Sequence, residues 1–216
     1  MENPVKVGLK RIEVWHDDFE AEIRAYEDEH ADKGQIVFYG PSNFTRWSAR
    51  YGNVPLREAL PGKSGRPCAL NRGFGSSCPE HHLYFYPRLI RAAEPGALVY
   101  SAGLGNGMFF GYTPEALFSL AQRVELYALS DFPGLRVYLL GENLNKSDKP
   151  HEVEFDGWLR EFAAETPGCA YLDITASAPL SRRDIYIADN VHYNAEGYRL
   201  YADFFREVLK DELDRY

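Results

Sequence analysis

The chain has 216 residues and a formal net charge of -8, and its length suits one large α/β domain. The acidic balance argues against nucleic acid as the main partner, because phosphate binding needs a basic face. It also gives no reason to expect binding to an anionic membrane surface. We see no apolar signal-peptide region at the start and no run long enough to span a bilayer. These features predict a cytoplasmic protein, with no information on oligomeric state.

The three cysteines, Cys68, Cys78 and Cys169, are odd in number and widely spaced. They match neither a disulfide framework nor a zinc-binding pattern. We expect them to be small core residues in a reducing compartment. The sequence therefore predicts no metal site and no cofactor.

The first third of the chain predicts a helix, a strand and a second helix. Residues 5–15 contain an alternating segment, Val5 to Val14, which fits an extra strand or an extended arm. Phe19, Ile23 and Tyr26 share one face of a helical pattern that Lys33-Gly34 ends. In chain order we expect a helix at 17–33, a strand at 35–39, a helix at 43–50 and a Gly/Pro-bearing connection at 52–66.

The middle of the chain repeats the order of strand, glycine-rich turn and helix. A short strand at 69–72 enters Gly73–Ser77, and the helix at 79–93 follows with Pro79 in its first turn. The apolar strand at 97–102 opens into Gly103–Gly107. A helix at 113–130 begins with Thr113 as N-cap.

The last third predicts strands at 135–140 and 170–174 and helices at 151–165 and 195–211, with an irregular loop over 175–193. Asn194 is a good N-cap for the final helix. The alternation of strands and helices predicts a parallel sheet with helices on both faces. Because we find no repeat and no linker, we expect one domain over 1–216, with 1–33 as an N-terminal arm plus helix.

Four loops leave the carboxyl ends of the predicted strands, where open parallel sheets place their chemistry. They are 40–43, 73–77, 103–107 and 175–193. Ser42 follows a strand and a sharp turn, so it fits either a helix cap or a nucleophile. Asp189 and His192 lie three residues apart just before the last helix. A serine, a histidine and an orienting carboxylate are the parts of a nucleophilic hydrolase, and we favour that interpretation.

Several motifs occur together in a recognisable order: Gly40-Pro-Ser42, Asn71-Arg-Gly-Phe-Gly-Ser76, Gly105-Asn106, Asp189-x-x-His192 and His192-Tyr-Asn-Ala-Glu-Gly-Tyr198. From about residue 34 to the C-terminus the chain resembles the SGNH (GDSL-type) hydrolase family. The most specific part of the resemblance is Asp-x-x-His followed by a Gly-Tyr helix. The resemblance implies a three-layer α/β/α sandwich of flavodoxin-like type, with a central parallel sheet of about five strands.

The resemblance also implies roles for individual residues. Ser42 would be the nucleophile, His192 the base and Asp189 its orienter. The oxyanion hole would consist of the backbone N–H groups of Ser42 and Ser76 and the side-chain amide of Asn106. The substrate would be a small-molecule acyl ester or an acetylated carbohydrate, whose binding residues the sequence does not identify.

The sequence departs from the family pattern at three places. Pro41 replaces the usual aspartate, which stiffens the turn and removes one N–H donor. Ser76 stands where glycine is usual, so its backbone must tolerate the required φ and ψ. The third block lacks its final carboxylate, and Asn106 is displaced if the register differs by one residue.

Other polar residues have simpler interpretations. We expect Arg46 and Trp47 to pack the top of their helix, and His81 and His82 to point apart rather than form a paired metal site. Glu142 and Asn143 leave a strand at the same rim and are candidates for substrate contact.

Three functions stay open at this point. The first is a serine esterase that works by acyl transfer, and the second is a binding protein of the same fold with weakened catalysis. The third is a flavin or phosphate binder that uses residues 40–45. We rank the third last because it leaves Asp189 and His192 unexplained.

Overall fold

The computed structural model describes residues 9–13, 15–143 and 150–216. Its centre is a parallel sheet of five strands, as the sequence predicted, and their order is β2-β1-β3-β4-β5. This is the doubly wound order in which the chain reverses its direction of winding between β1 and β3. The strands are β1 (Ile36–Gly40), β2 (Ala69–Gly73), β3 (Ala97–Tyr100), β4 (Arg136–Leu140) and β5 (Cys169–Leu172).

The helices of the described residues are α1 (His16–Asp28), α2 (Ser42–Thr45), α3 (Leu56–Ala59), α4 (Pro79–Tyr86), α5 (Leu104–Phe109), α6 (Pro114–Asp131), α7 (Pro150–Glu165), α8 (Ala195–Val208) and α9 (Lys210–Leu213). Shorter helical turns are η1 (Ala49–Tyr51), η2 (Pro87–Arg91), η3 (Ile174–Ala176) and η4 (Ala178–Ser181). No helix in the described ranges is long and apolar enough to cross a membrane.

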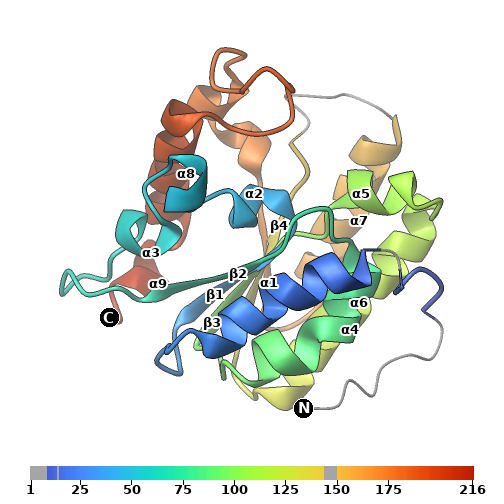
Figure 1. The fold of residues 1–216 in the computed structure, drawn as a ribbon, viewed down its shortest axis with the longest axis horizontal. Helices are drawn as coiled ribbons and strands as arrows, with labels where there is room; N and C mark the ends of the chain where they lie inside the picture. The colour runs from blue at the N-terminus through green and yellow to red at the C-terminus, as the bar shows by residue number, and fades with distance from the viewer. Residues whose placement is uncertain (1–8, 14, 144–149) are drawn as a thin grey trace.

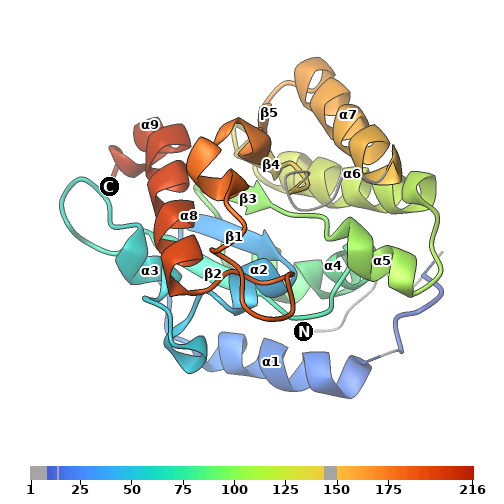
Figure 2. The ribbon, with the colours of Figure 1, turned by 90° about the horizontal axis from the view of Figure 1, so that it is seen from above.

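Two hydrophobic cores lie on opposite faces of the sheet, because side chains alternate between the faces along each strand. Val37 and Tyr39 of β1 face the core formed with α1, α4, α6 and α7. Ile36 and Phe38 face the core formed with α2, α3, α8 and α9. The two helical layers are visible on either side of the sheet in Figure 1 and from above in Figure 2. The predicted three-layer sandwich is confirmed.

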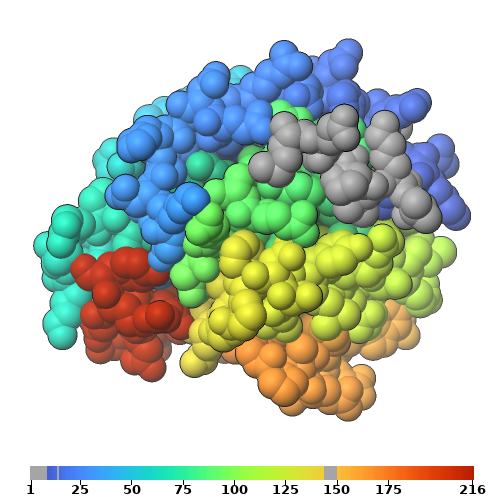
Figure 3. Space-filling model, turned by 90° about the horizontal axis from the view of Figure 1, so that it is seen from below, coloured from blue at the N-terminus to red at the C-terminus, as the bar shows by residue number. Residues whose placement is uncertain are grey.

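The margins of the sheet are covered by different helices. The space-filling view from below shows α1 along one margin and α7 along the other, with α4 and α6 between them (Figure 3). This arrangement follows the strand order, since β2 and β5 are the two edge strands. The edge strand β2 is held by α1 through Tyr26, whose hydroxyl donates to the Gly73 carbonyl.

Glycines at two strand ends allow the close approach of neighbouring backbone. At Gly40, which has a φ of 158°, a Cβ would lie 2.7 Å from the Ser101 carbonyl oxygen. At Gly73 a Cβ would lie 2.5 Å from the Phe44 Cβ and 2.8 Å from the Thr45 nitrogen. Glycine therefore lets α2 sit directly on the ends of β1 and β2.

The N-terminal segment differs from the prediction. The helix predicted to run to residue 33 ends at Asp28, where Glu29 takes up an extended conformation. The Glu29 carboxylate instead accepts a hydrogen bond from Arg72 at 2.6 Å. Residues 9–13 form no strand, and the rest of the predicted Val5–Val14 segment lies outside the described residues. The single domain with an N-terminal arm stays a prediction.

Two other predicted helices and one predicted loop differ from their expected form. The 43–50 helix is limited to α2, followed by η1. The 79–93 helix changes at Pro87 into the π-helical turn η2, because proline has no N–H to continue the α-helical pattern. The 103–107 loop contains the start of α5, which the sequence did not predict. Gly107 packs there directly against Leu117 of α6.

Candidate active site

Ser42 lies at the carboxyl end of β1, as its position in the sequence predicted. It is the first residue of α2, and Pro41 occupies the N-cap with no side-chain capping bond. The alternative interpretation of Ser42 as the helix cap is therefore wrong. Backbone N–H groups in the first turn of a helix have no intrahelical acceptor, so the Ser42 N–H can bind another group.

The residues before α8 form a tight loop that brings Asp189 and His192 together. Tyr186 and Tyr193 form an antiparallel bridge at its base, and Ile187 N–H donates to the His192 carbonyl at 2.9 Å. At the tip, Asn190 has a left-handed φ of 54°, a conformation that asparagine tolerates better than most residues. Asn194 caps α8 as predicted, accepting from Gly197 N–H at 3.0 Å.

Ser42, His192 and Asp189 form a continuous hydrogen-bonded chain across 150 residues of sequence. His192 Nδ1 lies 2.7 Å from Asp189 Oδ2, and His192 Nε2 lies 2.8 Å from Ser42 Oγ. A carboxylate can only accept, so Nδ1 carries the imidazole proton and Nε2 accepts from the serine hydroxyl. This is the arrangement in which a histidine can take a proton from serine.

Asp189 is held in its ionised form. Desolvation raises its pKa, but hydrogen bonds from the His192 ring and from the backbone N–H groups of His192 and Val191 lower it well below the usual range. Both backbone bonds reach Asp189 Oδ1, at 2.9 and 2.8 Å. One oxygen thus fixes the loop, and the other orients the imidazole.

The predicted oxyanion donors Ser76 and Asn106 differ in conformation and in hydrogen bonding. Ser76 is exposed and has a left-handed φ of 62°, so this serine does adopt the backbone conformation usually left to glycine. Asn106 lies in α5, and its Nδ2 donates to the Ser77 carbonyl at 2.8 Å. An amide nitrogen carries two protons, and this bond uses one of them.

A buried polar chain that the sequence did not predict lies beneath Ser76. Ser77 Oγ donates to the Phe74 carbonyl at 2.6 Å. His82 Nε2 lies 2.8 Å from Ser77 Oγ. His82 Nδ1 lies 3.0 Å from the Tyr100 hydroxyl. Because Ser77 has already donated its only proton, His82 donates from Nε2 and accepts from Tyr100. Burial, reinforced by nearby His81, holds the pKa of His82 well below its ordinary value.

The remaining candidates take mainly structural positions. Trp47 is buried in the core beside α8, as predicted, while Arg46 stacks over the Tyr51 ring. His81 and His82 are both fully buried. Cys68 and Cys78 are buried and Cys169 is half-buried. The described part of the chain has no group of three His, Cys, Asp or Glu side chains that could hold a metal ion.

Glu142 and Asn143 line a small cavity of about 30 Å³ beside the triad, together with Asn43 and Val191. Asn143 Nδ2 donates to the hydroxyls of Tyr186 and Tyr193, at 2.6 and 2.8 Å. Asn143 therefore supports the loop that carries His192. Whether either residue contacts substrate stays a prediction.

No protein-family model matches the sequence, and no curated protein is similar enough to be detected. Solved structures do match. A GDSL-like lipase from Bacteroides thetaiotaomicron aligns over 91% of this chain and 98% of its own, with 14% identity and a TM-score of 0.63. The chain has the fold of the SGNH (GDSL-type) hydrolases.

Two esterases show the same similarity. An acetylxylan esterase from Geobacillus stearothermophilus, solved as a catalytic mutant, covers 82% of this chain and 94% of its own, with 13% identity and a TM-score of 0.61. A psychrotrophic esterase from Pseudoalteromonas, solved with monoethylphosphonate as inhibitor, aligns over 83% of this chain and 100% of its own. The identity is 13% and the TM-score is 0.61. At these identities the SGNH-type likeness establishes the fold alone.

Proposed function

We propose that the protein is a serine hydrolase of the SGNH type that cleaves an ester through an acyl-enzyme intermediate. The observation that carries the proposal is the Ser42–His192–Asp189 hydrogen-bonded chain at the carboxyl edge of the sheet. The esterase and lipase names of several proteins with the same fold support it. The substrate would be an acyl ester or an acetylated carbohydrate.

The geometry gives each residue a chemical role in this proposal. Ser42 Oγ attacks the ester carbonyl while its proton moves to His192 Nε2. The ionised Asp189 stabilises the imidazolium that forms, and the imidazolium then protonates the leaving alcohol. Water repeats the sequence on the acyl-enzyme and releases the acid. The negative oxygen of each tetrahedral intermediate would be bound by the N–H groups of Ser42 and Ser76 and by the amide of Asn106.

A second candidate is a binding protein of the same fold with weakened catalysis. The bond from Asn106 to the Ser77 carbonyl favours it, because that bond commits part of an expected oxyanion donor to another group. Turnover of p-nitrophenyl acetate by the natural chain and by Ser42→Ala separates the two. The hydrolase proposal expects turnover that Ser42→Ala abolishes, and equal rates in the two chains would refute it.

A further inference from the structure

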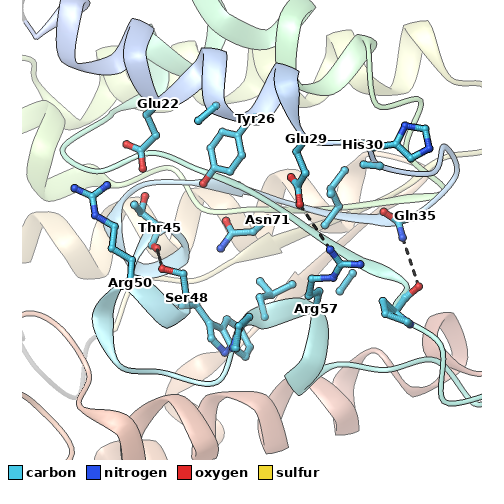
Figure 4. Close-up of a pocket in the computed structure, with 18 of the residues that line it drawn as sticks. Glu22, Tyr26, Glu29, His30, Gln35, Thr45, Ser48, Arg50, Arg57 and Asn71 are labelled. Carbon is cyan, nitrogen blue, oxygen red and sulfur yellow. Dashed lines mark hydrogen bonds and ion pairs between the residues drawn. The ribbon is translucent and has the colours of Figure 1, made fainter.

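A large groove lies beside the candidate active site, and none of the triad residues lines it. Its volume is about 930 Å³, which is within the usual range for small-molecule sites. One wall is α1, the other is formed by the segment from α2 to α3, and the edge strand β2 is the floor (Figure 4). The N-terminal helix therefore creates the groove.

The two walls carry opposite charges. Asp18 and Glu22 line the α1 side at a spacing that places them on one helical face, and Glu29 lines it just past the end of the helix. Arg50, Arg57 and Arg66 line the other side. Arg57 and Glu29 form an ion pair across the groove, at 3.9 Å. With Asp32, four acidic side chains and three arginines line the groove. Because opposite charges nearly cancel, the groove suits an uncharged ligand that both donates and accepts hydrogen bonds.

The groove is unsuited to an acyl chain. Trp47, Leu56 and Leu70 line it but are turned into the protein, with exposed fractions of 1%, 1% and 5%. The exposed ring of Tyr51 carries a hydroxyl and is covered by the guanidinium groups of Arg46 and Arg50. The α1 wall adds the small side chains of Ala21 and Ala25 and the ring of Tyr26, which lies under the Arg72 guanidinium and donates its hydroxyl to Gly73. Sites for fatty chains need a continuous apolar surface.

The groove is equally unsuited to a peptide that would add a strand to β2. The outward-facing Asn71 carbonyl already accepts from the Arg72 guanidinium at 2.9 Å. The Gly73 carbonyl accepts from Tyr26, and the Gly73 N–H donates to Asn71 Oδ1 at 2.9 Å. With these groups occupied, the edge offers few backbone partners to an added strand.

Thr45 gives an independent indication of a polar ligand. It lines the groove and is only 7% exposed, yet its Oγ1 has no hydrogen-bond partner among the described residues. Figure 4 shows its side chain directed toward Glu22 on the opposite wall. A buried hydroxyl without a partner is costly, and a ligand hydroxyl would satisfy it. Burial raises the pKa of the nearby Glu22 carboxyl, against the opposing effects of the Gly75 N–H and Arg50.

This end of the groove adjoins the nucleophile. Thr45 follows Ser42 by three residues in α2, about 4.5 Å along a helix axis. Gly75, which lines the same end, directly precedes Ser76. A ligand in the groove would therefore end close to the reacting serine.

We propose that the groove binds the alcohol part of the ester, and that this part is a neutral polyhydroxylated chain such as a short oligosaccharide. This inference rests on the proposed hydrolase function for the role of the ligand, but the binding itself requires no chemistry. Thr45, Glu22 and Arg50 hold the end of the chain nearest Ser42, and Glu29 and Arg57 hold hydroxyls farther along.

The test measures binding to the full chain carrying Ser42→Ala, which cannot form an acyl-enzyme. The probes are xylotetraose and cellotetraose, and the comparison probes are octanoate and an uncharged octapeptide. Binding is measured by titration calorimetry or ligand-observed NMR. We expect at least one oligosaccharide to bind and neither comparison probe to do so. Adding Thr45→Val or Glu22→Gln should weaken that binding roughly three- to tenfold, the usual effect of one lost hydrogen bond. Glu161→Gln, an exposed change on α7, should leave it unaltered.

Thr45→Val also controls for misfolding, since it removes an unpartnered hydroxyl while keeping the side-chain shape. Its melting temperature should equal or exceed that of the parent chain. The inference is overturned if neither oligosaccharide binds, if the two groove variants bind as well as the parent, or if octanoate or the peptide binds instead. A failure of ester hydrolysis would not change these binding results, so the two proposals fail separately.

Discussion

The described part of the chain has two serine–histidine pairs with the same separation and different surroundings. Ser42 Oγ lies 2.8 Å from His192 Nε2, and Ser77 Oγ lies 2.8 Å from His82 Nε2. The first pair is at the rim, where the His192 side chain is 15% exposed, and the second is fully buried. Distance alone therefore does not identify a nucleophile.

The partners of each histidine explain the difference. Ionised Asp189 orients His192 so that its Nε2 accepts the hydrogen bond from Ser42. At His82, the partner of Nδ1 is the hydroxyl of Tyr100 instead of a carboxylate. The Ser77 hydroxyl donates its hydrogen bond to the Phe74 carbonyl, not to the histidine. The buried pair is a satisfied structural network beneath Ser76. Breaking each pair should consequently affect different properties of the protein.

The largest expected effect is on turnover. Ser42→Ala should reduce ester hydrolysis by on the order of 10⁴- to 10⁶-fold, because the nucleophile is lost. Ser77→Ala, the matched change in the buried pair, should reduce it by no more than about tenfold, because only loop position is affected. Steady-state kinetics with p-nitrophenyl acetate measures both. Similar losses in the two variants would contradict the distinction between the pairs.

The next effect concerns the orienting carboxylate. Asp189→Asn should lower kcat by roughly 10⁴-fold, since the amide favours the wrong imidazole tautomer and cannot stabilise the imidazolium. Tyr100→Phe removes the corresponding partner of His82 and should leave kcat within about tenfold of its original value. A small loss for Asp189→Asn would show that the loop carboxylate does not orient the base.

Asn106 connects the two regions, because it donates to the Ser77 carbonyl and its helix α5 follows Gly103, which packs against Pro41 beside Ser42. If its second proton serves the oxyanion, Asn106→Ala should lower kcat by about 10²- to 10³-fold with KM little changed. If the residue only braces the Ser77 loop, the variant should melt earlier and keep its kcat. Kinetics and thermal unfolding on the same sample distinguish the two roles.

The smallest effect is on the pH dependence of stability. His82 has a folded pKa below its ordinary value near 6.5, so below that pH the unfolded chain takes up a proton that the folded chain does not. The contribution of neutral His82 to the free energy of unfolding is complete above pH 6.5. It is lost as the pH falls, at about 1.4 kcal/mol per pH unit. Chemical unfolding of His82→Gln between pH 7 and 5 should lack this slope.

Glu125 supplies a control of opposite sign. Burial raises its pKa to about 8, so its contribution to stability is present at low pH and is lost as the pH rises from about 4.5 toward 8. Glu125→Gln should remove that loss over the same range. If the slopes of both variants match the natural chain, the two buried groups do not titrate as the structure implies.

The sequence predicted the framework of the site because its signals are local. Apolar runs ending in glycine mark the strands, and the Asp-x-x-His spacing before an asparagine N-cap marks the loop of Asp189 and His192. The start of α5 was missed because Gly103, Gly105 and Gly107 look like a turn. Its stability comes from packing against Leu117, which lies outside the local pattern.

The buried chain and the groove depend on contacts between distant segments. Adjacency predicted that His81 and His82 point apart, but it gave no sign that Tyr100 lies next to His82. The groove needs α1, the segment from α2 to α3, and β2 at once. No sequence motif predicts that these three segments lie together, because each segment taken alone has the pattern of an ordinary polar surface.

The most direct test of the proposed function is covalent labelling with a fluorophosphonate probe, followed by mass spectrometry to locate the adduct. The account predicts one adduct on Ser42, none on Ser77, and loss of labelling in Ser42→Ala and His192→Ala. An unlabelled natural chain, or an adduct that persists in Ser42→Ala, would contradict it.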